Sequence, residues 1–357
     1  MIFTAFSRIH VNSIKMNACG GWGGGGIGFS VKRPRLSIDF SKSDNVQIEC
    51  QNKKLKQIIK NYVTTFIKRY QVPGCRIKVL EFFEPHRGLG SETQAGLLIG
   101  KAFNKIYNLN IEKEEIVKLF KIAGVSGIGY YSFFEGGFIV EGGYHMGKNC
   151  EKIDFNVHSS EPPVLVSRYD FPKEMKILLI IPNKSPVDSF SRIKENALFK
   201  ENTPISLKEI GDISTSVLTG LIPGIITKNY NQIVKNLMFI STLGTKRLEL
   251  KINFDLIKDI QEKMSDIIEF KYYHKERNTF SLVNDKNQEI TSFVNGNEEI
   301  LIKKPIPWLG LSSLGSTLYS VLNIDDEKQN SLIKEISKRI KDVKIIITEV
   351  KNGKSSF

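Results

Sequence analysis

The sequence of 357 residues is poor in cysteine and has no long apolar run. Its four cysteines, Cys19, Cys50, Cys75 and Cys150, are far apart and form no Cys-x-x-Cys pair, which argues against a zinc knuckle or a disulfide framework. No stretch approaches the roughly 20 apolar residues that cross a bilayer, so we expect no membrane segment. The basic region and cleavage site of a secretory signal are also missing at the N-terminus, and a cytoplasmic location is expected.

The composition is that of a soluble globular protein, with 41% hydrophobic and 25% charged residues. A chain of this length is about right for two domains. The formal net charge of +13 is spread over all segments and is not gathered in a recognisable RNA- or DNA-binding motif, so nucleic acid is not expected as a partner. The excess positive charge favours an acidic small molecule such as a sugar phosphate.

The apolar patterns alternate between strand and helix periods and predict an α+β fold. A turn at Pro34 is expected between two early strands. The stretch from Pro162 to Ser185 is the natural boundary, which predicts domains of residues 1–175 and 176–357. The expected elements include a strand over Ile2–Val11, a helix from Leu55 to Tyr70, helices over Ala95–Tyr107 and Ile111–Ala123, helices between Ser189 and Phe270, and a closing helix and strand after Asn330.

A glycine-rich loop, Gly88-Leu89-Gly90-Ser91-Glu92-Thr93-Gln94, lies between a predicted strand and a predicted helix. Its two glycines let backbone N–H groups converge, and Ser91 is placed to cap the helix. A helix N-terminus of this kind attracts anions because its N–H groups are unpaired and the helix dipole favours negative charge. An ordinary serine-capped turn is the alternative interpretation.

Further motifs accompany this loop, and together they resemble the GHMP kinase superfamily. Within it, the closer similarity is to the β-ribofuranosylaminobenzene 5'-phosphate synthase family, over most of the first 185 residues and again from Gly310. The motifs that carry the resemblance are Arg8-Ile9-His10, Gly25-Gly26-Ile27-Gly28, the Gly88 loop, Ser126-Gly127-Ile128-Gly129, Phe134-Glu135-Gly136-Gly137, Pro162-Pro163 and the segment from Gly310 to Tyr319.

The resemblance implies a GHMP-kinase-like fold of two domains and an enzyme of tetrahydromethanopterin biosynthesis. Such an enzyme joins phosphoribosyl pyrophosphate to a para-substituted benzoate, either 4-hydroxybenzoate or 4-aminobenzoate, and releases carbon dioxide and pyrophosphate. Mg²⁺ would be required to neutralise the pyrophosphate oxygens. The partners are then small-molecule substrates. The sequence leaves the oligomeric state open, with a homodimer as one arrangement.

The residue types and their places in these motifs suggest site residues in three groups. In the catalytic group, His145 is a candidate general base, since an ordinary histidine pKa of about 6.5 suits proton transfer, and Glu135 is a candidate for contact with Mg²⁺ or the ribose. No metal ligands are assigned. The phosphate-binding candidates are Arg8, Arg87, Gly88, Gly90, Ser91, Thr93 and Gln94, and the substrate-binding candidates are Gly26, Gly28, Ser312, Ser313 and Gly315.

Three departures from the related patterns bear on the function. Many GHMP kinases have a catalytic aspartate a few residues after the Ser-Gly pair, whereas Ser126-Gly127-Ile128-Gly129-Tyr130-Tyr131 has none, which favours the synthase over a kinase. Two other departures are from the patterns of the synthase family and the superfamily. The segment from Gly21 to Gly24 lacks the arginine and aspartate that are usual in the synthase family. Ser316 stands where the superfamily often has proline. The alternatives are an ATP-dependent small-molecule kinase and an inactive relative that binds a phosphorylated metabolite.

Overall fold

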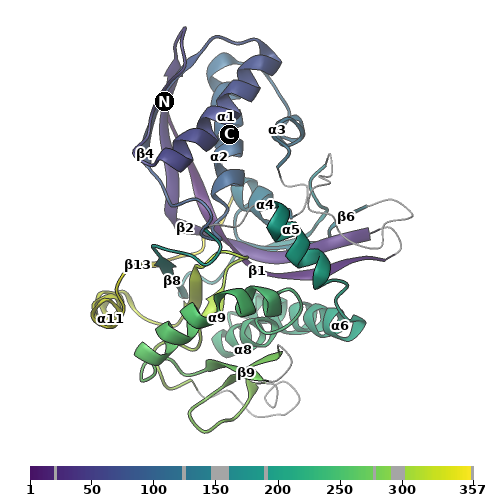
Figure 1. Ribbon diagram of the computed structural model, residues 1–357, viewed down its shortest axis with the longest axis vertical. Coiled ribbons are helices and arrows are strands. Elements are labelled where there is room, and N and C mark those ends of the chain that lie inside the picture. Colours follow the sequence, from purple (N-terminus) through teal and green to yellow (C-terminus); the bar gives the residue numbers. More distant parts are fainter. Residues whose placement is uncertain are drawn as a thin grey trace.

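The fold is a mixed α+β arrangement seen in a computed structural model (Figure 1). The structure describes residues 1–19, 22–122, 126–145, 161–188, 192–275, 279–290 and 302–354. In these residues the strands form two larger sheets and a small hairpin. Their positions bring segments from the beginning, middle and end of the chain together.

In the described residues, the first sheet has seven strands in the order β3-β4-β2-β5-β7, with β1 and β6 also paired to β2. Among the described strands of this sheet, only the pairing of β3 with β4 is parallel. The sheet is formed by β1 (Ile2–Cys19), β2 (Trp22–Lys42), β3 (Gln47–Glu49), β4 (Cys75–Glu81), β5 (Phe138–Glu141), β6 (Tyr144–His145) and β7 (Leu165–Tyr169).

The long strand β2 differs from the two strands that the sequence predicts. Pro34 does not end a strand, and the chain continues from Trp22 to Lys42. A shift in the pairing with β1, from Phe6 opposite Arg35 to Ser7 opposite Val31, absorbs the residues around the proline as a bulge. A bulge tolerates proline because the residues inside it do not need a ladder N–H group.

Helices α1 and α2 pack together beside this sheet in the upper part of Figure 1. Leu55, Ile59, Val63 and Phe66 line the buried face of α1, as their spacing of three and four residues predicts. The side chain of Asn52 caps this helix by accepting from the N–H of Leu55. The helices of this half are α1 (Lys53–Tyr70), α2 (Ser91–Tyr107), α3 (Lys113–Phe120) and α4 (Ile128–Phe134).

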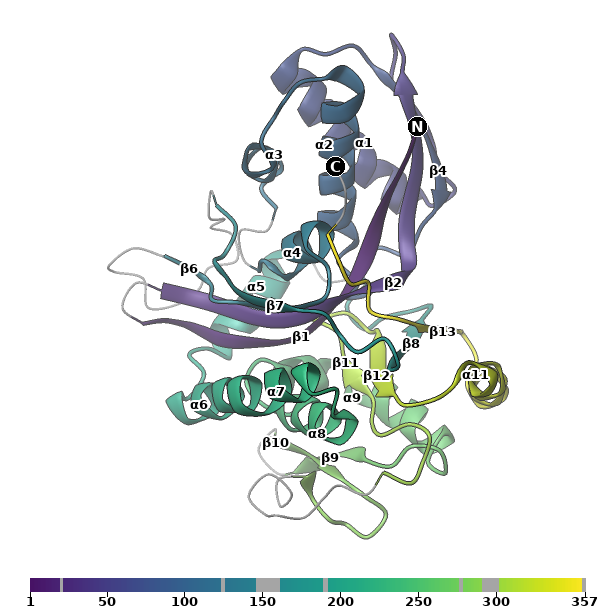
Figure 2. The same cartoon turned by 180° about the vertical axis from the view of Figure 1, so that it is seen from behind.

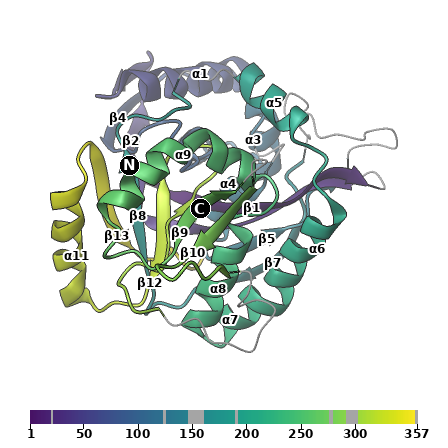
Figure 3. The same ribbon diagram turned by 60° about the horizontal axis from the view of Figure 1, so that its bottom comes forward.

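The second sheet is antiparallel, with the described strands in the order β11-β12-β8-β13. Figure 2 shows α6, α7 and α8 below the long β1–β2 hairpin, and Figure 3 shows α9 between these helices and α11. The elements are β8 (Lys176–Pro182), α5 (Arg192–Glu201), α6 (Leu207–Thr215), the π-helix η1 (Ser216–Leu221), α7 (Ile222–Ile226), α8 (Tyr230–Ile240), α9 (Lys246–Lys263), β9 (Lys271–Lys275), β10 (Thr279–Val283), β11 (Gly310–Leu311), β12 (Leu318–Leu322), α11 (Asp326–Arg339) and β13 (Val343–Thr348).

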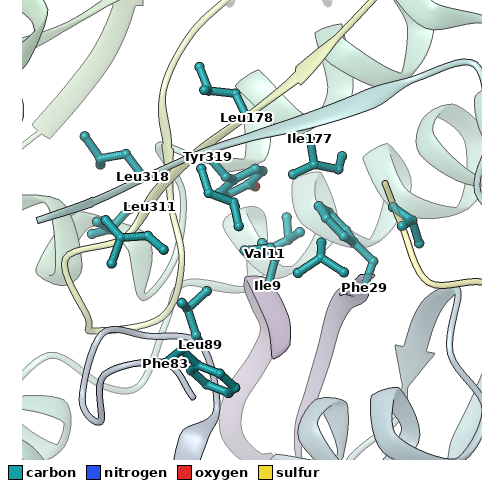
Figure 4. Packing of buried hydrophobic residues seen from close by; sticks show 14 of the residues in the cluster. Ile9, Val11, Phe29, Phe83, Leu89, Ile177, Leu178, Leu311, Leu318 and Tyr319 are labelled. Carbon is teal, nitrogen blue, oxygen red and sulfur yellow. The ribbon is translucent and has the colours of Figure 1, made fainter. Parts of the chain in front are cut away.

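One continuous core joins the two larger sheets. Ile9 and Phe29 of the first sheet lie near Ile177 and Tyr319 of the second, and all four side chains are buried (Figure 4). Leu89 of the glycine-rich loop belongs to the same cluster, so the loop is anchored to the core by its apolar residue. Strand β7 belongs to the first sheet and β8 to the second. The division into domains at residue 175 stays a prediction.

Candidate active site

A pocket of about 280 Å³ lies where four distant segments meet: β1, the Gly88 loop with the start of α2, the segment after β8, and the turn after β11. This volume is close to the lower end of the range for small-molecule sites. Arg8 contributes a permanently charged side chain to its wall. The lining residues are Arg8, His86, Gly88, Gly90, Ser91, Glu92, Thr93, Val187, Ser313, Leu314 and Gly315.

The Gly88 loop and the turn after β11 are packed backbone against backbone. A Cβ atom on Gly88 would lie 2.0 Å from the carbonyl oxygen of Ser312, and one on Gly315 would lie 2.1 Å from the nitrogen of Gly88. Both positions therefore require glycine. The buried hydroxyl of Ser312 donates to the carbonyl of Gly88 at 2.7 Å and accepts from the N–H of His10 at 3.2 Å. Ser312 thus fastens the loop to β1, whereas Ser313 and Gly315 line the pocket.

Helix α2 begins at the pocket, with Gly90 as its N-cap in the left-handed region at φ 80°. The expectation that Ser91 caps the helix is wrong, because Ser91 is its first helical residue and no side chain supplies a capping hydrogen bond there. The first N–H groups of a helix have no partner within it. With Ser91 and Thr93 on the pocket wall, these groups are donors of the kind that bind anions.

Arg8 supplies the cationic side of this site. It is half-buried on β1, its backbone N–H donates to Leu89, and its guanidinium donates to the carbonyl of Gly88. Burial lowers the pKa of Arg8 to about 10, against the opposite effect of Glu249, so the side chain is still protonated at neutral pH. A partly desolvated guanidinium beside free helix N–H groups is well suited to a phosphate or pyrophosphate.

Arg87 directly precedes the Gly88 loop in the sequence, but its side chain does not line the pocket. Its buried guanidinium forms an ion pair with Asp188 and donates to the carbonyl of Asn183. These contacts tie the start of the loop to the segment that follows β8. The structure therefore gives Arg87 a role in holding the loop, and direct phosphate binding by this residue stays a prediction.

A buried ion pair lies against β1 and β11. Lys246 at the start of α9 pairs with Glu249, and it also donates to the carbonyl oxygens of Leu311 at 2.8 Å and His10 at 3.3 Å. Desolvation lowers the pKa of Lys246 and raises that of Glu249, while each partner opposes the shift of the other. The hydrogen bonds from Lys246 to these two carbonyls connect α9 to β1 and to β11.

Glu141 is a buried carboxyl group at the end of β5, with 1% of its surface exposed. It accepts hydrogen bonds from the N–H groups of Gly143 at 2.7 Å and Gly127 at 3.4 Å. Burial raises its pKa to about 7, against the opposing effect of these two hydrogen bonds. Glu141 was not among the site residues predicted from the sequence, although a single carboxylate at the end of the apolar run Phe138-Ile139-Val140 was a visible signal.

The raised pKa of Glu141 leads to a stability prediction. The folded state keeps its proton up to about pH 7, whereas the unfolded carboxyl loses it near 4.5, so ionisation destabilises the fold as pH rises between these values. The full effect is about 3 kcal/mol, at 1.36 kcal/mol per pKa unit. We expect Glu141→Gln to gain stability relative to the unmodified chain between pH 5 and pH 8, as measured by urea unfolding. A stability difference that does not change with pH would contradict this explanation.

The other predicted binding residues lie around the pocket or behind it. Thr93 lines it, while Gln94 is fully buried behind it and donates to the carbonyl of Gly129 at 2.8 Å. Gly28 packs against β1, since a Cβ there would lie 2.3 Å from the carbonyl oxygen of Ile9. Gly26 faces His10 and Glu141 from the same strand. Neither Gly26 nor Gly28 is among the residues that line the pocket.

The two predicted catalytic residues do not line this pocket. Glu135 follows α4 and lies 3.4 Å from the amino group of Lys354, near the end of the chain. His145 is exposed on β6, where its ring meets that of Trp22 edge to face at 6.0 Å. Strand β6 pairs with β2 near the tip of the β1–β2 hairpin. The unusual Gly21 to Gly24 segment includes Trp22 at this tip, and Gly21 itself is outside the described residues.

Four pocket residues were not selected from the sequence. His86 and Glu92, 3.6 Å apart, are charged or polar residues beside the glycine motif, and their position was the available signal. Val187 and Leu314 had no such signal, because their place in the pocket depends on packing. They belong to a separate small apolar cluster with Met16, Phe199, Ile205 and Leu248. Val187 and Leu314 thus add apolar surface to the lining of the pocket.

A metal cluster and a membrane helix are both absent from the part of the chain that the structure describes. No group of three or more histidine, cysteine, aspartate or glutamate side chains is arranged there to hold a metal ion. None of the described helices has the length and apolar character needed to cross a bilayer. Glu92 is the one carboxylate among the residues that line the pocket.

Comparison with known proteins identifies the family. Residues 57–137 match the model of the GHMP kinases N terminal domain. The chain is 34% identical over 275 residues to beta-ribofuranosylphenol 5'-phosphate synthase of Methanocaldococcus jannaschii, covering 73% of this chain and 82% of that protein. The chain belongs to this synthase family. The protein of the same name from Methanothermobacter thermautotrophicus is 25% identical over 99% of this chain and 97% of its own length.

Solved structures agree with the fold expected for this family. A putative homoserine kinase from Listeria monocytogenes matches with a TM-score of 0.59 at 13% identity, covering 99% of this chain and 96% of the other. At that identity the likeness concerns the fold alone. The predicted GHMP-kinase-like α+β fold is confirmed, and the family membership confirms the predicted class of enzyme, a decarboxylating pentosyltransferase of methanopterin biosynthesis.

Proposed function

We propose that the pocket binds phosphoribosyl pyrophosphate and that the enzyme transfers the phosphoribosyl group to 4-hydroxybenzoate. The observation that carries this proposal is the convergence of Arg8, the N-terminus of α2 and the turn from Ser313 to Gly315 on one pocket. These groups supply a cation and backbone donors for a pyrophosphate. The relatives are named for making a ribofuranosylphenol phosphate. A phenol has a hydroxyl group on its ring, so the name supports 4-hydroxybenzoate rather than 4-aminobenzoate as the acceptor.

The reaction needs the ring carbon that carries the carboxylate to attack the anomeric carbon of the sugar. The para hydroxyl group pushes electrons towards this ring carbon as the bond to pyrophosphate breaks. Loss of carbon dioxide then returns an electron pair to the ring and restores its aromaticity. The protein aligns the two substrates and stabilises the charge on the departing pyrophosphate through Arg8 and the N–H groups of α2. Val187 and Leu314 form an apolar surface for the ring.

The pocket is compatible with Mg²⁺ bound together with the substrate. Glu92 lies in the first turn of α2, where a carboxylate would repel a bound pyrophosphate unless a cation lay between them. Mg²⁺ often uses one or two protein carboxylates together with substrate phosphates and water, so Glu92 is the proposed protein ligand. When bound, the ion would neutralise charge on the pyrophosphate oxygens.

A kinase function is less well supported by the surroundings of Ser126-Gly127. The side chains of Ile128 and Tyr130 are buried, and the hydroxyl of Tyr130 donates to the carboxylate of Glu114 at 3.2 Å. A Cβ on Gly129 would lie 3.0 Å from the side chain of Thr93, so this position has little room for an aspartate. A catalytic base in the position usual for GHMP kinases is therefore missing from this turn.

The proposal is tested by offering the enzyme each set of substrates. With phosphoribosyl pyrophosphate, Mg²⁺ and 4-hydroxybenzoate we expect a ribosylated phenol phosphate, detected by mass spectrometry. With ATP and a panel of sugars or isoprenoid alcohols we expect no ADP above the background rate. ADP formation that depends on one of these alcohols, without a product from phosphoribosyl pyrophosphate, would replace the proposed function by a kinase.

A further inference from the structure

Arg87 joins the Gly88 loop to two other segments that line the pocket. Its backbone carbonyl accepts from the N–H of Thr317 at 3.3 Å, between β11 and β12. Its guanidinium reaches the segment after β8, where it donates to the carbonyl of Asn183 at 2.5 Å and forms an ion pair with Asp188. The Arg87 side chain is 8% exposed, so this pair is screened less than an ion pair on the surface.

The segment after β8 makes a compact turn that carries Val187. Through its second carboxylate oxygen, Asp188 accepts from the N–H of Ser185 at 2.8 Å. The hydroxyl of Ser185 accepts from the N–H of Val187 at 3.3 Å. The carboxylate of Asp188 therefore contacts Arg87 with one oxygen and the turn with the other, and the position of the Val187 backbone depends on both contacts.

Val187 supplies apolar surface in a pocket that is otherwise mostly polar. It is 8% exposed, and in the lining it is joined by Leu314, a member of the same second, smaller apolar cluster. The other lining residues are polar, charged or glycine. A phosphorylated sugar presents hydroxyl and phosphate groups, whereas a benzoate ring presents an apolar face. The acceptor ring is therefore the part of the substrates that gains most from contact with Val187 and Leu314.

Val187 is able to discriminate between substituted rings because its side chain is short and β-branched. A β-branched side chain has a restricted χ1, so the backbone that carries it largely determines where its methyl groups lie. One methyl group more or less in an apolar pocket changes kcat/KM about 10- to 200-fold. A small shift of the Val187 backbone is therefore enough to change which rings fit.

We propose that the ion pair between Arg87 and Asp188 positions Val187 against the acceptor ring and thereby limits which ring substituents the enzyme accepts. This inference rests on the proposed function. Arg87 and Asp188 are positioning residues, and Val187 is the residue that touches the substrate. The pair adds little to the affinity for phosphoribosyl pyrophosphate, because its two charges neutralise each other and Arg87 is not among the residues of the pocket wall.

The test measures kcat/KM for 4-hydroxybenzoate and for its derivatives with a methyl group at ring carbon 2 or ring carbon 3. Val187→Ala removes two methyl groups from the pocket wall, and the selectivity for 4-hydroxybenzoate over at least one derivative should fall about tenfold or more. Asp188→Asn keeps the size of the side chain but breaks the ion pair. The same selectivity should fall, with a higher KM for 4-hydroxybenzoate and little change in the dissociation constant of phosphoribosyl pyrophosphate.

Two matched variants show whether a loss of stability alone changes the selectivity. Asp266→Asn also breaks an ion pair with an arginine, Arg339. Val217→Ala makes the same truncation as Val187→Ala, but in the main apolar core. Neither Asp266 nor Val217 is among the residues that line the pocket, so both variants should keep the selectivity of the unmodified enzyme.

Two milder variants complete the test. Arg87→Lys keeps the cation but loses the planar guanidinium, so an intermediate selectivity is expected. Ser185→Ala removes the hydroxyl that accepts from Val187 and should lower the selectivity in the same direction. Unchanged selectivity in folded Asp188→Asn would overturn the proposal, and Ser185→Ala decides in the same way if Asp188→Asn does not fold. Arg87→Lys with normal selectivity and weakened binding of phosphoribosyl pyrophosphate would also overturn it and assign Arg87 to the phosphate site.

The failure of this inference is distinguishable from failure of the proposed function. An unmodified enzyme that makes no product from phosphoribosyl pyrophosphate and 4-hydroxybenzoate rejects the proposed function itself. An active unmodified enzyme whose selectivity is the same in the Asp188→Asn variant rejects only the positioning role of the ion pair.

Discussion

Replacing Arg8 by alanine is expected to weaken the binding of phosphoribosyl pyrophosphate about a hundredfold or more. Arg8 is the arginine of the pocket wall, and it is partly desolvated, so its charge is not fully screened by water. Hydrogen bonds to charged groups contribute about 1.5 to 3 kcal/mol each, and two of them account for a change of this size. Isothermal titration calorimetry in the presence of Mg²⁺ measures the change.

Two controls separate charge from loop structure. Arg8→Lys keeps the charge but loses the planar two-pronged geometry, so an intermediate affinity is expected. Arg76→Ala removes an exposed arginine from β4 and should leave affinity unchanged. Arg8 also donates to the carbonyl of Gly88, but this carbonyl keeps its hydrogen bond from Ser312 in the variant. An affinity for the Arg8→Ala variant within threefold of the unmodified enzyme would exclude Arg8 from the phosphate site.

Replacing Gly90 by valine is expected to abolish binding of phosphoribosyl pyrophosphate while the protein stays folded. Gly90 has a φ of 80°, a conformation that a β-branched residue adopts only with strain. A Cβ there would also lie 3.1 Å from Cγ of Arg8, which would push the arginine from its position on the pocket wall. We expect no detectable binding by calorimetry, with a loss of stability of about 1 to 3 kcal/mol.

Gly211→Ala is the matched glycine control for this prediction. Gly211 lies in α6, and a Cβ there would have no atom within 4 Å. The substitution should preserve activity and raise stability by up to about 1 kcal/mol, since alanine favours helix more than glycine does. Normal ligand affinity in a folded Gly90→Val protein would refute the role of the loop in phosphate binding.

The sequence was most informative where local chemistry determines structure. The apolar spacing from Leu55 to Phe66 predicted helix α1, and the glycines at 88 and 90 predicted a strand-to-helix loop, because both patterns act over a few residues. The turn expected at Pro34 and the cap expected at Ser91 were wrong. In both cases the backbone conformation depends on neighbouring segments, namely the pairing with β1 and the left-handed Gly90.

The side chains of the site were harder to predict because their partners are distant in the sequence. Arg87 has the position in the sequence that is typical of a phosphate ligand. Its guanidinium instead forms an ion pair with Asp188, about a hundred residues later in the chain. Val187 and Leu314 reach the pocket through packing of the second apolar cluster. Glu135 and Glu141 are both carboxylates near glycines, and only the arrangement of the sheet brings Glu141 opposite Gly26.

The measurement that tests the central claim most directly uses 4-hydroxybenzoate labelled at its carboxyl carbon. With phosphoribosyl pyrophosphate and Mg²⁺, we expect labelled carbon dioxide and pyrophosphate to appear in equal amounts and at equal rates. This equality follows because attack by the ring carbon gives a non-aromatic intermediate that recovers aromaticity by losing the carboxylate. Label that stays in a ribosylated product while pyrophosphate is released would contradict the account and indicate transfer to an oxygen atom instead.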